Sequence, residues 1–319
     1  MEKLGGYHGR VSDAPSENWV YRMLPPAIWP YAQLARWDRP IGWQLLLWPC
    51  IWSATLAANA AVTLGRFSGG VLLYHLFLYF IGAVAMRGAG CTYNDLVDHE
   101  IDMEVARTRS RPLPSGRVSR RQAKMFIVLQ ALAGLLVLLQ FNWFAVFLGV
   151  ASLAIVALYP FAKRFTDWPQ FFLGLAFSWG ALMGWAGIFG SLSLAALFLY
   201  AASIVWTIGY DTIYAHQDKE DDELIGVRST ARLFGEKTRQ WLVGLYGLTI
   251  VLMFVGFALA GVGAFAYLGL IAAGGMFAYQ IVTLDINDPE QCLALFKSNN
   301  RVGLIIFAGL FLSLLFAVP

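Results

Sequence analysis

The chain of 319 residues is 58% hydrophobic and only 13% charged, with a formal net charge of +3 and a mean hydropathy of +0.60. Soluble domains carry about 25% charged residues, so this composition excludes an ordinary soluble protein and indicates a protein embedded in a lipid bilayer. The small net charge gives no reason to expect a nucleic-acid partner, and no segment suggests an obligate protein partner. The three cysteines lack the spacing of a metal or redox motif.

The N-terminal residues lack the apolar core of a signal peptide and include acidic residues that are unusual in a mitochondrial transit peptide. We therefore expect a bacterial inner membrane, with the mitochondrial inner membrane as the alternative. The stretch PPAIWPYAQLARWDRP interleaves aromatic residues with Arg36, Asp38 and Arg39 and is typical of an interfacial segment, or simply of an anchor. These features predict a cytoplasmic tail over residues 1–30 and one polytopic membrane domain over residues 31–319.

Apolar stretches of about twenty residues, the length that crosses a bilayer, recur along the rest of the chain. They cover residues 41–64, 71–93, 123–141, 143–162, 170–190, 193–213, 240–261, 263–284 and 302–318. The turns near Asn142 and Ser191 are tight, so two neighbouring stretches could merge and about eight to ten spans are compatible with the pattern. The sequence predicts an all-α integral membrane protein, a bundle of about nine transmembrane helices.

Lysine and arginine residues concentrate in alternate loops of this arrangement. The segment before the first predicted helix and the loops after the second, fourth, sixth and eighth contain nearly all of them, whereas Arg66 stands alone in the opposite set. Positive charge in short loops is retained on the cytoplasmic side. We therefore expect a cytoplasmic N-terminus.

Two acid-rich stretches lie at the cytoplasmic ends of the second and sixth predicted helices. The first reads NDLVDHEID and places Asn94, Asp98 and Asp102 four residues apart, and the second reads DTIYAHQDKEDD and places Asp218 and Asp222 four residues apart. A spacing of four puts each set on one face of a helix. Because both stretches leave the membrane on the same side, we expect them to face each other across one cytoplasmic mouth of the bundle.

Carboxylate and amide oxygens are the hard ligands that Mg²⁺ prefers, and Mg²⁺ commonly completes its shell with water and substrate phosphates. The five oxygen-bearing residues are too few for a closed cage and suit a pair of ions completed by a diphosphate. A cation-transport pathway and a solvated network of salt bridges remain open as alternatives.

Three basic loops on the same side strengthen the first interpretation. The stretch RTRSRPLPSG contains Arg111, YPFAKRFTDWPQ contains Lys163 and Arg164, and GVRSTA contains Arg228. Guanidinium groups and hydroxyls are donors that bind phosphate oxygens. Any one of these loops could equally be a topology signal, but three of them beside two acidic stretches favour a phosphate site.

Together these residues resemble the UbiA-type intramembrane prenyltransferases, and within that family the 4-hydroxybenzoate polyprenyltransferases of ubiquinone biosynthesis. Residues 94–102 match the motif NDxxDxxxD and residues 211–222 match DxxYAxxDxxxD. The stretches RWDRPIG, RPLPSG, YPFAKRFTDWPQ, GVRSTA and FKSNNRVG also look like that branch, so the resemblance covers nearly the whole chain after about residue 30. One departure is His99, where a basic residue often follows the third position of the motif.

The resemblance implies a Mg²⁺-dependent transfer of a polyprenyl group from polyprenyl diphosphate to the 3-position of 4-hydroxybenzoate. The implied metal ligands, for two Mg²⁺ ions, are Asn94, Asp98, Asp102, Asp218 and Asp222. The implied catalytic residues are Asp98, Asp102, Asp218, Asp222, Arg164, Asp211 and Tyr214.

Within this scheme, Arg164 would hold the acceptor carboxylate, and Lys163, Arg111 and Arg228 would bind substrate, chiefly the diphosphate. Asp95 could belong to the metal face or pair with an arginine. A relative acting on another aromatic acceptor, and a cation-coupled transporter, remain the alternatives.

Overall fold

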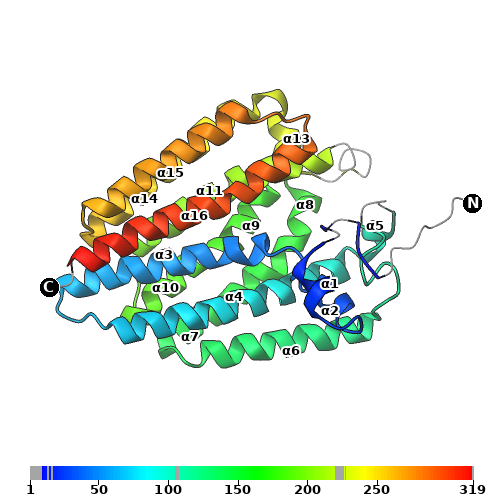
Figure 1. The fold of residues 1–319 in the computed structure, drawn as a ribbon, viewed down its shortest axis with the longest axis horizontal. Coiled ribbons are helices and arrows are strands. Elements are labelled where there is room, and N and C mark those ends of the chain that lie inside the picture. The colour runs from blue at the N-terminus through cyan, green and yellow to red at the C-terminus, as the bar shows by residue number, and fades with distance from the viewer. Residues whose placement is uncertain are drawn as a thin grey trace, which may run out of the picture. The chain divides into compact units, whose positions relative to one another are not determined.

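The computed structural model describes residues 9–12, 14–15, 17–104, 108–219, 226 and 228–317, and all regular structure within these residues is helical (Figure 1). The chain divides into two compact units. Unit 1 comprises Met1–Trp43 and Ile81–Val137, and unit 2 comprises Gln44–Phe80 and Leu138–Pro319. The two units are described separately below.

Within the described residues, nine helical segments are long and apolar enough to cross a membrane. Six of these segments are single helices: α3 (Ile41–Thr63), α4 (Gly69–Val97), α6 (Arg120–Leu138), α11 (Leu194–Ala215), α15 (Ala264–Thr283) and α16 (Pro289–Ala317). The other three are composite. Trp143–Phe165 consists of α7 (Trp143–Leu158), η1 (Tyr159–Phe161) and α8 (Ala162–Phe165); Pro169–Phe189 consists of α9 (Pro169–Ser178) and α10 (Gly180–Phe189); and Thr230–Ala260 consists of α13 (Thr230–Phe234), η3 (Gly235–Lys237) and α14 (Thr238–Ala260). The predicted all-α membrane architecture is confirmed.

The tight turns that left the helix count open are true helix boundaries. The Asn142 side chain accepts a hydrogen bond from the Ala145 N–H (3.0 Å) and so caps α7. Gly190 ends α10 in the left-handed conformation at φ 64°, and the Ser193 hydroxyl accepts from the Ala196 N–H (3.4 Å) at the start of α11. Such caps satisfy backbone groups that a helix end leaves without partners, and the neighbouring helices therefore stay separate.

Unit 1 contains the short helices α1 (Trp19–Met23), α2 (Trp29–Leu34) and α5 (His99–Glu104), together with the end of α4 and α6. Its described core cluster joins Leu34 of α2 to Leu96 of α4 and to Leu113 and Val118 of the loop before α6. The aromatic stretch before α3 is therefore packed against the helix that carries the first acidic motif. Its role goes beyond that of a membrane anchor.

Unit 2 is organised around α11, which packs against α9, α10, α14 and α16. Small residues let some of its helices approach closely. A Cβ added at Gly184 of α10 would lie 2.6 Å from the backbone nitrogen of Ala54 in α3. Gly269 and Gly309 bring α15 and α16 together, and Figure 1 shows these two helices side by side.

Candidate active site

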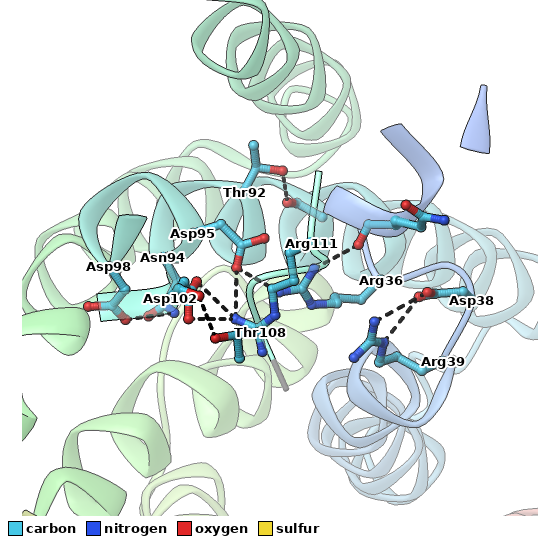
Figure 2. A network of polar contacts seen from close by, with 12 residues as sticks. Arg36, Asp38, Arg39, Thr92, Asn94, Asp95, Asp98, Asp102, Thr108 and Arg111 are labelled. Carbon is cyan, nitrogen blue, oxygen red and sulfur yellow. Dashed lines mark hydrogen bonds and ion pairs between the residues drawn. The ribbon is translucent and has the colours of Figure 1, made fainter. Parts of the chain in front are cut away.

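The first acidic motif lies where α4 passes into α5, in unit 1 (Figure 2). The Asp98 N–H donates to the Asn94 carbonyl (2.9 Å), and the Asp102 N–H donates to the Asp98 carbonyl (2.8 Å). These bonds carry the helical i to i+4 relation across the break between the two helices. The predicted clustering of Asn94, Asp98 and Asp102 on one face is thus present in the structure.

The three side chains form a compact set of oxygen donors. The Asn94 Nδ2 donates to Asp98 Oδ2 (3.1 Å), which orients the amide. Asp98 and Asp102 are buried. Among the residues that the structure describes, no three His, Cys, Asp or Glu side chains gather into a metal-binding group. Two carboxylates and one amide oxygen nevertheless fit Mg²⁺, because this ion takes few protein ligands where phosphates supply the rest.

Arg111 and Asp95 lie beside these oxygen donors (Figure 2). The Arg111 Nη1 donates to both carboxylate oxygens of Asp102, at 3.2 and 3.1 Å, and lies 3.4 Å from Asp95 Oδ1. The same Asp95 oxygen accepts a 2.6 Å hydrogen bond from Arg36 Nη2. Asp95 therefore pairs with arginines, which is one of the two roles that its position in the motif left open.

The electrostatics of the site follow from burial of these charges. Burial raises the pKa of the Asp102 carboxyl; the Arg111 guanidinium opposes that rise, and the carboxylates of Asp95 and Asp98 add to it. The Thr108 hydroxyl donates to the Asp102 carbonyl (2.9 Å) and ties the following loop to α5. The arginines thus hold together carboxylates that would otherwise repel one another.

The second motif lies at the end of α11, in unit 2. Asp211 and Tyr214 occupy its last turns, half-buried, and the Tyr214 ring lies 4.6 Å from the ring of Phe296. Asp218 ends the short helix η2 (His216–Asp218), but its side chain lies outside the described side chains, and Asp222 lies outside the described residues. The structure therefore gives no geometry for these two predicted metal ligands.

Two of the predicted basic loops lie together in unit 2. The Arg228 N–H donates to the Lys163 carbonyl (3.4 Å), and Arg228 Nη1 donates to the Phe165 carbonyl (3.4 Å). Arg228 Nε also lies 3.8 Å from the Asp167 carboxylate. Arg164 is exposed on α8, with its guanidinium over the Phe161 ring at 5.3 Å. The two loops, which the sequence placed on the same side of the membrane, are in contact.

Sequence reasoning missed the buried polar contacts that fasten these loops to α11. The Thr230 N–H donates to Gln170 Oε1 (3.0 Å), and the hydroxyls of Thr230 and Thr212 are 2.6 Å apart. All three side chains are buried. Their only signal in the sequence was membership of the stretches YPFAKRFTDWPQ, GVRSTA and DTIYA.

His216 is buried where α11 ends and η2 begins. Its Nε2 lies 2.9 Å from the Thr238 hydroxyl. Burial lowers the pKa of His216 to about 4, and the Lys219 charge adds to this effect. The imidazole is therefore neutral at neutral pH.

The fold and the oxygen donors define a multi-pass membrane protein with the acidic motif of a metal-assisted transferase. Residues 46–315 match the UbiA prenyltransferase family, and this chain belongs to that family.

Relatives with high identity share one description. The chain is 49% identical over 299 residues to the mitochondrial 4-hydroxybenzoate polyprenyltransferase of Drosophila melanogaster, covering 92% of this chain and 73% of that protein. It is 47% identical over 300 residues to the protein of the same name from Bos taurus, covering 92% and 77%.

Solved structures of the family have the same fold. A UbiA homolog from Aeropyrum pernix K1, in its apo form, aligns with a TM-score of 0.67 and 26% identity, covering 82% of this chain and 97% of that one. A UbiA homolog from Archaeoglobus fulgidus bound to GPP and Mg²⁺ aligns with a TM-score of 0.62 and 18% identity, covering 89% and 99%.

Proposed function

We propose that this protein is a 4-hydroxybenzoate polyprenyltransferase. It transfers the polyprenyl group of a polyprenyl diphosphate to the 3-position of 4-hydroxybenzoate and releases diphosphate, a membrane step of ubiquinone biosynthesis. The acceptor is supported by relatives of that name at 49% and 47% identity. The observation that carries the reaction class is the continuous face formed by Asn94 and the buried Asp98 and Asp102, with Arg111 beside it.

The metal-binding residues of this proposal are Asn94, Asp98, Asp102, Asp218 and Asp222, for two Mg²⁺ ions. Bound Mg²⁺ neutralises negative charge on the departing diphosphate. The support is the donor chemistry of the first motif and the Mg²⁺ present in the Archaeoglobus fulgidus homolog structure. For Asp218 and Asp222 the support is the sequence motif alone.

The chain's own cations complete the diphosphate site in this scheme. Arg111, Lys163 and Arg228 donate to phosphate oxygens, and guanidinium forks suit such oxygens in pairs. When the C–O bond of the allylic diphosphate breaks, the electron pair leaves with the diphosphate. Donors already oriented toward that oxygen stabilise the developing charge.

The acceptor ring attacks the allylic carbon from the position ortho to its hydroxyl. A new C–C bond forms, and the ring then loses the proton from the same carbon. We assign the acceptor carboxylate to Arg164, and we assign to Asp211 and Tyr214 the orientation of the acceptor or removal of that proton. General bases act within hydrogen-bond reach of the proton that they remove.

Aromatic side chains of unit 2 can shelter the cation from water. Trp206 and Tyr210 of α11 lie 4.9 Å apart, Tyr210 lies 5.8 Å from Phe296 of α16, and Phe296 contacts Tyr214. The first two rings are fully buried and form core, whereas Tyr214 is half-buried. The Tyr214 end of this row can therefore meet a passing cation with a ring face.

The sequence favoured a bacterial inner membrane, but the relatives favour the alternative, the mitochondrial inner membrane. The names of the relatives from Drosophila melanogaster and Bos taurus place those proteins in mitochondria. We therefore propose the mitochondrial inner membrane over the bacterial one. Fractionation of the source cells, with an antibody against the chain, tests this assignment; recovery in a bacterial inner-membrane fraction contradicts it.

The test of the reaction uses membranes that contain the protein. They are incubated with labelled 4-hydroxybenzoate and an allylic diphosphate of geranyl length or longer, with Mg²⁺ or with EDTA. We expect a labelled, lipid-soluble product with Mg²⁺ and none with EDTA. Absence of product with every donor contradicts the acceptor assignment, and product formed from another aromatic acid identifies the replacement.

A further inference from the structure

We propose that Arg36 is a positioning residue: it neutralises Asp95, and Arg111 therefore pairs with Asp102 in the first acidic motif. The inference deepens the proposed function and rests on it, because Arg111 is the arginine assigned to the diphosphate. It also makes the N-terminal segment that carries Arg36 a structural part of the active site.

Asp95 is a buried carboxylate. Its side chain is 0% exposed, and a buried carboxylate persists only when it is paired. The Arg36 contact is short, at 2.6 Å, whereas the Arg111 contact with the same oxygen is 3.4 Å. Arg36 is thus the close partner of Asp95, and Arg111 is the distant one.

Arg111 contacts both Asp102 and Asp95. Its Nη1 lies closer to the two oxygens of Asp102, at 3.2 and 3.1 Å, than to Asp95. Figure 2 shows Arg111 in contact with both carboxylates, and Arg36 reaching the same oxygen of Asp95 as Arg111 does. Among the residues labelled in Figure 2, Arg111 is the other arginine in contact with the buried Asp95. We therefore expect loss of Arg36 to draw Arg111 from Asp102 toward Asp95.

The backbone of Arg36 adopts a left-handed conformation. Arg36 has a φ of 57°, the only positive φ of a non-glycine among the described residues. The Trp37 N–H donates to the Ala32 carbonyl (2.9 Å), so Arg36 occupies the left-handed position after α2 where glycine is usual. A glycine would adopt this conformation without strain. The arginine is therefore present at a conformational cost, which its buried side-chain contacts offset.

Gln33 and Arg117 attach the N-terminal segment to the loop before α6. Gln33 is 0% exposed, and its Nε2 donates to the Gly9 carbonyl (2.7 Å) while its Oε1 accepts from Arg117 Nη1 (2.8 Å). Arg117 also donates to the carbonyls of Gly9 and Ser110, both at 2.6 Å. These bonds fasten the segment that presents Arg36 to the loop that presents Arg111. The same hydrogen-bonded part of unit 1 thus positions the guanidinium groups of both Arg36 and Arg111.

The conformation of Arg36 also supplies the informative variant. Arg36→Gly removes the guanidinium but relaxes the backbone, so the turn after α2 is preserved. Arg36→Gly/Asp95→Asn removes both charges of the close pair. No unpaired carboxylate at position 95 then attracts Arg111, which stays paired with Asp102. Arg22→Ala is the matched control, because Arg22 is an arginine of the same segment whose side chain is 68% exposed in its contact with Glu17.

The experiment measures binding as well as turnover. Detergent-purified proteins are titrated with inorganic diphosphate at fixed Mg²⁺, and thermal unfolding is followed by tryptophan fluorescence. The KM for the polyprenyl diphosphate and kcat are then measured in membranes. We expect Arg36→Gly to weaken diphosphate binding and raise that KM about tenfold or more, with the double variant returning to within about threefold of the wild type.

Two outcomes overturn the inference. Unchanged diphosphate binding in Arg36→Gly shows that Arg36 does not set the site, and a double variant as impaired as Arg36→Gly shows that Arg36 does not act through Asp95. Failure of the proposed function looks different. In that case the wild type makes no product from 4-hydroxybenzoate, while the diphosphate titrations still rank the variants.

Discussion

The buried contact between Gln170 and Thr230 gives a quantitative prediction about how the basic loops are held. Thr230 is the first residue of α13, so its N–H is one of those that a helix leaves without an internal partner, and Gln170 Oε1 accepts it at 3.0 Å. Gln170→Leu leaves this buried donor unsatisfied. That costs about 1–3 kcal/mol, and we expect the free energy of unfolding to fall by this amount.

A second variant at the same contact has a smaller expected effect. Thr230→Val removes a hydroxyl that lies 2.6 Å from the Thr212 hydroxyl, but the Thr212 hydroxyl still donates to the Ile208 carbonyl (2.6 Å). No buried donor is orphaned in this pair, so the cost is that of one ordinary hydrogen bond, about 0.5–1.5 kcal/mol. The expected order of destabilisation is therefore Gln170→Leu above Thr230→Val.

The assay is unfolding of detergent-purified protein, followed by tryptophan fluorescence, with activity measured on the same samples. Gln240→Leu serves as the control, because Gln240 is exposed and such substitutions stay within about 0.5 kcal/mol. Because the contact also places the segment of Arg228 beside Lys163, Gln170→Leu should raise the KM for the polyprenyl diphosphate. A larger loss of stability for Thr230→Val than for Gln170→Leu would refute the reasoning.

The remaining predictions concern packing and substrate binding. Gly184→Ala forces a Cβ to within 2.6 Å of the Ala54 backbone nitrogen, so the free energy of unfolding should fall by about 1–3 kcal/mol. The Cβ of Gly244→Ala in α14 meets nothing within 4 Å, so this substitution should be neutral or slightly stabilising. The same unfolding assay compares them, and equal effects contradict the packing argument. Asp98→Ala should abolish Mg²⁺-dependent turnover in a protein that still unfolds cooperatively, and substantial activity removes Asp98 from the metal site. Arg164→Met should raise the KM for 4-hydroxybenzoate at least tenfold with little change in the KM for the diphosphate; the reverse pattern in steady-state kinetics places Arg164 on the diphosphate.

Local patterns of the sequence were sufficient for the membrane architecture and for the first motif. Hydrophobic length determines a span wherever it occurs, and nine spans are found among the described residues. The i to i+4 relation of Asn94, Asp98 and Asp102 is equally local, and it persists across the break between α4 and α5. These features depend only on neighbours in the chain.

The same patterns misplaced the start of the last helix. The expected span began at residue 302, whereas α16 begins at Pro289, with Asp288 Oδ1 accepting the N–H groups of Glu290 and Gln291. The polar residues Asn299 and Asn300 break the hydropathy pattern. In the folded chain, each accepts a tryptophan N–H at 2.9 Å, from Trp206 and Trp48 respectively. A helix can therefore continue through residues that hydropathy alone rejects.

The polar contacts that position the candidate site depended on the tertiary structure. Arg36 and Asp95 are 59 residues apart in the chain, and Gln170 and Thr230 are 60 apart. No periodicity connects such residues, because their pairing depends on which helices pack together and on which charges become buried. The sequence by itself determined the membrane spans and the acidic motif with its local register. Only the folded chain decided that Asp95 pairs with Arg36 and that Arg111 pairs with Asp102. A buried charge requires a partner, and no single stretch of sequence specifies which charges become buried.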